Sequence, residues 1–141
     1  MAVVNFRNAS VVYNAVDISV KVRNIRLNLS AEDLDGTAMG ATSRTHVPGL
    51  RDDRIELTVF QDYAVGVLDS VFAAQLGVAA GVACVIKPDS GAVTTSNPSY
   101  TLTNAVLLDY SAMDGEVGTL QLITIVLVPA AGSPGIVRAT V

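Results

Sequence analysis

Apolar and polar residues alternate along several segments of this chain, and the alternation restricts the fold more than any other feature. In the stretch RIELTVF, Ile55, Leu57 and Val59 alternate with polar side chains. Successive side chains of a β-strand point to opposite faces of its sheet, so this pattern predicts a strand with one buried face. Residues 99–110 and 118–128 continue the pattern. The chain is therefore predicted to have a mainly β fold.

A second alternating segment changes phase at Asn24. Its apolar residues are Val20, Val22, Ile25, Leu27 and Leu29. A β-bulge inserts one extra residue into a strand, so we predict a bulge at this point. Basic side chains of this segment and of the next strand are expected to form a row opposite the core face: Lys21, Arg23, Arg26 and Arg54.

One segment departs from the alternation. Its apolar residues follow helical spacing: Leu68, Val71, Phe72 and Leu76. Positions i, i+3, i+4 and i+8 share one face of a helix, so these residues predict a short amphipathic helix that Gly77 can end. Together with the strands, the segment predicts an antiparallel β-sandwich or open barrel that carries one short α-helix.

The 141 residues of the chain match the size of one domain. We therefore expect residues 1–141 to form a single domain. Residues 1–14 are predicted to be an N-terminal arm or strand, and residues 33–50 a long loop between two strands. Residues 129–141 contain two prolines and two glycines before a short β-prone tail, which favours a C-terminal arm.

The composition is unusually apolar for a domain of this size. Hydrophobic residues make up 50% of the chain, charged residues 16%, and the mean hydropathy is +0.47. Soluble domains usually carry about 25% charged residues. The excess predicts surface that becomes buried between copies of the chain, although a domain merely rich in Ala and Val stays open. The net charge of −4 and the lack of a Lys/Arg cluster disfavour nucleic-acid binding.

The residues that catalysis needs are few. His46 is the only histidine, and Ser43 lies near it without the glycine-flanked turn of a serine hydrolase. Both lie in one predicted loop, which positions reacting groups poorly. Cys84 is the only cysteine and lies in an apolar run, so a buried thiol is expected. The sequence therefore predicts that the protein is not an enzyme.

The protein is not expected to bind a cofactor or a metal ion, or to contact a membrane. The acidic stretch 32–36 lacks the spacing of a calcium loop, and the pair Asp52 and Asp53 is expected to form a solvated turn. The stretch GTAMG lacks the lysine of a phosphate-binding loop. The first ten residues lack the continuous apolar core of a signal peptide, and residues 71–86 are too short and interrupted for a membrane span.

The predicted loop 33–50 is polar and carries a few isolated large side chains, Met39, Arg44, His46 and Leu50. Long loops between strands either have a function or are disordered. This composition suits a segment that becomes ordered against a partner, and the alternative is a loop that stays in solvent.

An ordered series of short motifs resembles the tail tube (major tail) proteins of long-tailed bacteriophages. The series spans roughly residues 15–128 and includes LNLSAEDLDGTAMG, SRTHVPGLRD, IELTVFQDYAVG, VIKPDSGAVTTSNPSYT and LLDYSAMDGEVGTL. In the last motif, Ala112 and Met113 stand near the place where the family has a proline. Tail terminators, head–tail joining proteins and capsid-decorating proteins have similar sandwiches, so they remain alternatives. An Ig-like carbohydrate or receptor-binding module is the alternative from another class.

The resemblance implies a virion structural protein that forms stacked rings, typically hexamers. A sheet of each subunit would line a channel that the tape-measure protein fills first and that DNA later traverses without specific binding. The protein would be assembled in the host cytoplasm and would reside in the virion tail with other tail proteins. The loop and the terminal arms would contact neighbouring rings, and the loop residues expected to anchor this contact are Leu34, Met39, Arg44, His46, Pro48 and Leu50.

Overall fold

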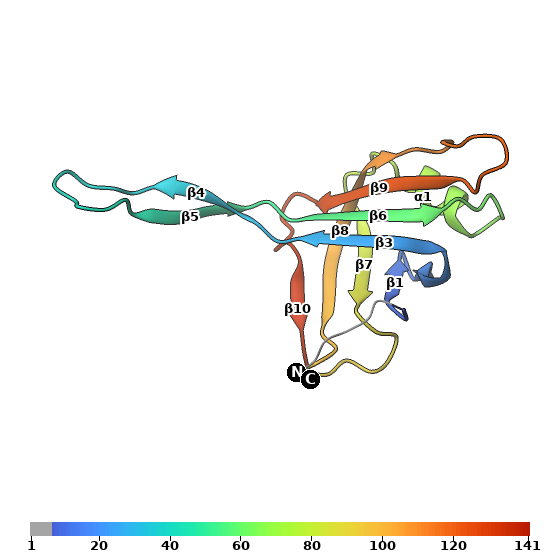
Figure 1. The fold of residues 1–141 in the computed structure, drawn as a ribbon, viewed down its shortest axis with the longest axis horizontal. Coiled ribbons are helices and arrows are strands. Elements are labelled where there is room, and N and C mark those ends of the chain that lie inside the picture. The colour runs from blue at the N-terminus through green and yellow to red at the C-terminus, as the bar shows by residue number, and fades with distance from the viewer. Residues whose placement is uncertain (1–6) are drawn as a thin grey trace.

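The computed structural model describes residues 7–141 as a β-sheet body from which a long β-hairpin projects (Figure 1). The body sheet has the order β2-β1-β7-β8-β9-β6-β3, and β10 also pairs with β8. The body strands are β1 Ser10–Tyr13, β2 Val16–Asp17, β3 Val22–Asn28, β6 Arg54–Phe60, β7 Val82–Lys87, β8 Ser99–Tyr110, β9 Leu122–Pro129 and β10 Val137–Ala139. The hairpin strands are β4 Ala31–Asp35 and β5 His46–Arg51, and the helices are the 3-10 turn η1 Ser19–Lys21 and α1 Leu68–Gln75. The predicted mainly β, antiparallel fold with one short α-helix is confirmed.

The long strand β8 belongs to both halves of the bent sheet. Its first half pairs with β7 and β10, and its second half pairs with β9. The ladder to β9 shifts register between Leu107 and Asp109, which is the kind of irregularity that bends a strand. In Figure 1, β3, β6 and β9 run nearly at right angles to β7 and β8. The two halves of the sheet therefore enclose a core between them.

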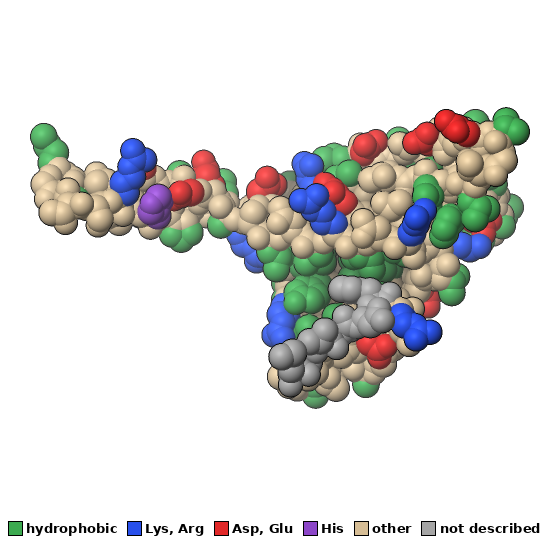
Figure 2. Space-filling view, viewed as in Figure 1, with side chains coloured by type: hydrophobic (Ala, Val, Ile, Leu, Met, Phe, Trp, Pro, Cys, Tyr) green, Lys and Arg blue, Asp and Glu red, His purple; other side chains and the backbone are tan. Residues whose placement is uncertain are grey.

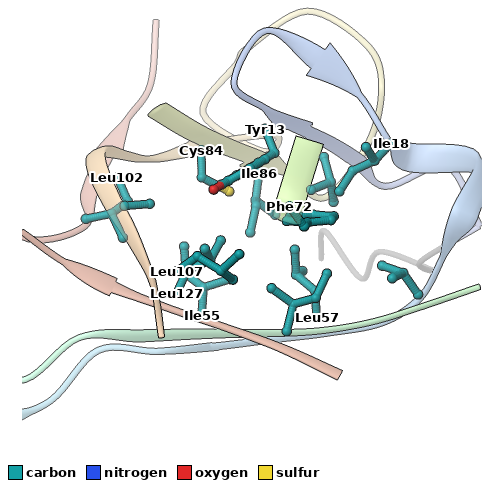
Figure 3. Close-up of a cluster of buried hydrophobic side chains, with 14 of the residues drawn as sticks. Tyr13, Ile18, Ile55, Leu57, Phe72, Cys84, Ile86, Leu102, Leu107 and Leu127 are labelled. Carbon is teal, nitrogen blue, oxygen red and sulfur yellow. The ribbon is translucent and has the colours of Figure 1, made fainter. Parts of the chain in front are cut away.

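The core contains apolar side chains from both halves of the sheet and from α1. Figure 3 shows Leu57, Leu107, Phe72 and Tyr13 pointing toward one another. The rings of Tyr13 and Phe72 stack with their centroids 4.8 Å apart. The ring centroid of Tyr110 lies 5.8 Å from that of Phe72. Full burial of each such side chain contributes about 1.5–3 kcal/mol, so this cluster is the main source of stability.

The helix places its predicted apolar residues in three different environments. Leu68 and Phe72 are fully buried, and Val71 packs against the edge of the core. Leu76 differs from the expectation because it follows the helix as its C-cap and is 48% exposed. With only eight residues, α1 ends before its face can reach position i+8. Gly77 follows with a positive φ of 73° and turns the chain away from the helix axis.

The predicted bulge at Asn24 is confirmed. Val22 pairs with Val59 whereas Asn24 pairs with Thr58, so the register shifts between them. The prediction for Val20 was wrong, because this residue lies in η1 and its side chain is exposed. The backbone N–H of Ser19 bonds to the carboxylate of Asp17, and this local turn replaces the start of the strand.

The segments expected to be terminal arms contribute to the body. Residues 10–13 of the expected N-terminal arm or strand form β1 between β2 and β7, while residues 1–6 lie outside the described part of the chain. In the expected C-terminal arm, residues 137–139 pair with β8 as β10, and Ile136 joins the core. The chain returns to the body because Gly132 and Gly135 adopt positive φ, which lets it reverse direction.

Candidate assembly surfaces

The expected loop 33–50 is largely a β-hairpin. In the ladder of β4 with β5, Leu34 pairs with Val47 and Asp35 pairs with His46. The sequence predicted a long loop between two strands, but most of this segment is paired, because β4 and β5 continue the ladder of β3 with β6. The hairpin extends far beyond the body in Figure 1.

The turn of the hairpin, residues 36–45, is held by local hydrogen bonds. The carboxylate of Asp35 accepts bonds from the backbone N–H and the hydroxyl of Thr37, at 2.9 and 2.5 Å. These bonds lower the pKa of Asp35, with the hydroxyl contributing most. The backbone N–H of Thr45 donates to the Thr37 hydroxyl at 2.9 Å. These bonds, which hold the base of the turn, all form within the hairpin.

The six predicted anchor residues all lie on the hairpin and are exposed to solvent. Met39 is fully exposed at 104% and Leu50 at 82%, and the others are Leu34, Arg44, His46 and Pro48. Neither β4 nor β5 contains a buried residue. An isolated two-stranded hairpin is marginally stable at best in water, so contact with a further surface would stabilise this one.

His46 contacts a carboxylate rather than Ser43. Its Nδ1 lies 2.9 Å from both carboxylate oxygens of Asp33, and both side chains are largely exposed. No hydrogen bond joins His46 to Ser43 among the described contacts. The two side chains are 61% and 65% exposed, and Figure 2 shows the histidine with acidic side chains beside it on the surface of the hairpin.

A buried carboxylate joins the base of the hairpin to the C-terminal segment. Asp53 is 0% exposed, and its Oδ2 accepts bonds from the backbone N–H of Ile136 at 2.8 Å and from Arg51 at 2.5 Å. Arg51 also donates to the carbonyl of Ile136 at 3.0 Å. A Cβ on Gly135 would collide with the Asp53 carboxylate. The expectation that Asp53 lies in a solvated turn was wrong, because the residue that covers it comes from the far end of the chain.

The expected basic row is partly neutralised within the subunit. Lys21 forms an ion pair with Asp62 at 2.8 Å and lowers the pKa of that carboxyl. Arg26 lies opposite Glu56 in the ladder, with the charged groups 4.0 Å apart. The same outer sheet face continues onto β9 with small and β-branched side chains such as Thr124. This face lies opposite the core, and among the described residues no ion pair forms with Arg23 or Arg54, so part of the basic row stays unbalanced within the subunit.

The remaining groups that could react or bind a metal ion are few among the described residues. Cys84 is fully buried in β7, as expected, and burial raises the pKa of its thiol to about 12. Within residues 7–141, no group of three or more histidine, cysteine or acidic side chains is placed to hold a metal ion. None of the helices in this part of the chain has the length and apolar character needed to cross a membrane.

Comparisons with known proteins find similarity in structure only. No protein-family model matches the chain, and no curated protein matches it. It is similar to a chain of an extracellular contractile injection system, the PVC sheath/tube terminator in its extended state, with a TM-score of 0.69, 15% identity, and coverage of 98% of this chain and 97% of that one. A chain of the PVC sheath-tube complex matches with a TM-score of 0.67, 12% identity and coverage of 99% and 93%.

A third similar structure is the virion of a native gene transfer agent particle, with a TM-score of 0.64, 16% identity, and coverage of 93% of this chain and 97% of that one. Such low identities establish the fold and nothing finer. The chain therefore has the fold shared by components of sheath-tube, tube-terminator and gene transfer agent structures, as its resemblance to tail tube proteins implied.

Proposed function

We propose that the protein is a structural subunit of a phage-like tail tube, built from rings of this chain that stack on one another. The main observation behind this proposal is the projecting hairpin, whose side chains are exposed on a fold shared with tube and terminator structures. The hairpin would contact the neighbouring ring through the anchor residues named above. Residues 1–141 would act as one assembly unit, located in the tail of a particle assembled in the host cell.

Free strand edges supply the surface for ring formation. Within residues 7–141, β3 is an edge strand that pairs with β6 on one side only, and β2 is the edge strand at the other end of the sheet order. Unpaired edge strands favour pairing with another chain, and repeated contact between different edges of identical subunits closes a ring. We propose that such contacts form the hexamers that the resemblance implies.

The outer face of β3, β6 and β9 suits the lining of a channel. Arg26 lies beside Glu56, and neighbouring positions carry side chains such as Thr58 and Thr124 that bear no charge. Arg54 lies on the same face and adds a positive charge, so acidic residues of a neighbouring subunit would balance it, because an excess of basic residues would retain the phosphates of DNA. This face would first surround the tape-measure protein and later the passing DNA.

Electron microscopy of the purified full chain tests the proposal. The natural chain is expected to form stacked rings. A variant in which a two-residue Asn-Gly turn replaces residues 36–45 keeps the pair of Asp35 with His46, so it should fold and form rings that do not stack. Cooperative thermal unfolding of the variant checks its fold. Normal stacks of the shortened variant would refute the role of the hairpin.

A tube terminator is the second candidate, because one of the similar structures contains a sheath/tube terminator. A terminator caps a tube and should form single rings, whereas a tube subunit should form stacks at the same concentration. Single rings alone, in the presence of tape-measure protein, would favour the terminator.

A further inference from the structure

We propose that the end of the subunit opposite the hairpin is the surface that receives the hairpin tip of a second copy of this chain. This surface, the loop end, consists of residues 61–67 between β6 and α1 and residues 111–121 between β8 and β9. The proposal rests on the proposed function and specifies the partner of the hairpin.

The hairpin and the loop end lie at opposite ends of the same strands. Strand β6 leaves the hairpin at Arg54 and reaches the loop end after Phe60, and β9 begins just beyond the loop end. Figure 1 shows the hairpin and these loops at the two extremes of the long axis of the molecule. A contact between opposite ends of identical subunits generates an open stack, because each copy still offers one free end.

The loop end exposes several large apolar side chains. Val65 is 96% exposed and Val117 is 106% exposed, and the others are Tyr63, Met113 and Leu120. Figure 2 shows hydrophobic side chains both at this end and at the tip of the hairpin. Exposed apolar side chains that cluster in this way typically mark an interaction surface. Met39 at the hairpin tip is a fitting partner, since its flexible side chain adapts to irregular surfaces.

Hydrogen bonds already hold the two loops of the loop end together. The carbonyl of Ala112 accepts bonds from the side chains of Gln61 at 2.8 Å and Tyr63 at 2.9 Å. Gln61 also donates to the hydroxyl of Tyr110, and its backbone N–H donates to the carbonyl of Gln121. A surface ordered before binding loses less conformational entropy when a partner docks.

The charges of the two surfaces are complementary. Arg44 is the single charged residue of the turn 36–45, which therefore carries a charge of +1. The segment 111–121 carries Asp114 and Glu116 and no basic residue, which gives a charge of −2. Opposite charges favour the encounter of the hairpin tip with the loop end and fix its register. This complementarity favours a second copy of the chain as the occupant.

Charge reversal in the full-length chain tests the proposal, with stacking scored by electron microscopy. Arg44→Glu alone, and Asp114→Lys with Glu116→Lys, should each reduce the fraction of rings in stacks at least about tenfold, because every subunit of a ring repeats the contact. The chain that carries all three changes should regain stacking. If the separate variants lose stacking and the combined variant does not regain it, the proposed contact between the hairpin tip and the loop end is wrong.

A second set of variants separates this proposal from the proposed function. Val117→Asp with Leu120→Asp should abolish stacking but leave thermal unfolding unchanged, since both side chains are exposed. Ala92→Asp, in the exposed turn between β7 and β8, is the matched control and should stack normally. If the shortened hairpin fails to stack while the Val117 and Leu120 variant stacks normally, the loop end is not the acceptor and the proposed function stands. If the shortened hairpin itself stacks normally, the proposed function fails.

Discussion

Asp53→Ala should detach the C-terminal segment from the base of the hairpin and lower the stability of the whole domain. The substitution removes the acceptor of the buried Ile136 N–H, and a buried donor left without a partner costs about 1–3 kcal/mol. The ion pair with Arg51 adds about 0–1 kcal/mol, because the arginine side chain is 46% exposed and solvent screens it. The Oδ1 of Asp53 has no partner among the described residues, so its removal offsets part of the loss.

The net destabilisation expected for Asp53→Ala is therefore about 1–3 kcal/mol. Urea unfolding measures this free energy, and hydrogen exchange at the Ile136 amide measures the local opening. Asp53→Asn should cost less, because an amide oxygen can still accept the bond from Ile136. Asp52→Ala is the matched control and should change stability by less than about 0.5 kcal/mol, since its side chain is exposed. Equal stability of the natural chain and Asp53→Ala would refute the reasoning.

Three further outcomes follow from the packing of the body. Phe72→Ala should lower the free energy of unfolding by about 3–5 kcal/mol in urea, whereas Val65→Ala, at an exposed position, should leave it nearly unchanged. Gly81→Ala should destabilise the fold by more than Gly118→Ala, as measured by calorimetry. Both glycines have positive φ, but a Cβ at Gly81 would also lie 2.8 Å from the backbone of β8. The free energy of unfolding should fall as the pH rises from about 9 toward about 12, because the Cys84 thiol stays protonated in the folded state and ionises in the unfolded one. In the same range Cys84→Ala should flatten the slope of stability against pH; an unchanged slope would contradict this.

Strands with strict alternation could be predicted because their evidence is local. Ile55, Leu57 and Val59 share one face of β6, and all three are fully buried. The phase change at Asn24 predicted the bulge of β3 for the same reason. One extra residue moves every later side chain to the other face of a regular strand, and a bulge returns the apolar side chains to the core face. The helical spacing of Leu68 and Phe72 likewise placed two core residues correctly.

Other features depended on contacts between distant segments. Leu34 and Val47 pair in the hairpin because β3 and β6 bring their two segments together, and little in residues 33–50 themselves marks strands. The burial of Asp53 likewise depends on Ile136, which lies 83 residues further along the chain. A local pattern contains no information about such a partner.

The sequence by itself determined which residues face the core of the main strands, that a short α-helix packs on them, and that the chain is unusually apolar. Only the tertiary structure decided that the polar segment 33–50 projects as a hairpin, that residues 137–139 return to β8, and that apolar loops gather at the opposite end. The physical reason is the range of the interactions involved. Periodicity records how each residue meets its own sheet or helix, whereas the placement of these surfaces depends on the bend of β8 and on pairings that only the folded chain brings together.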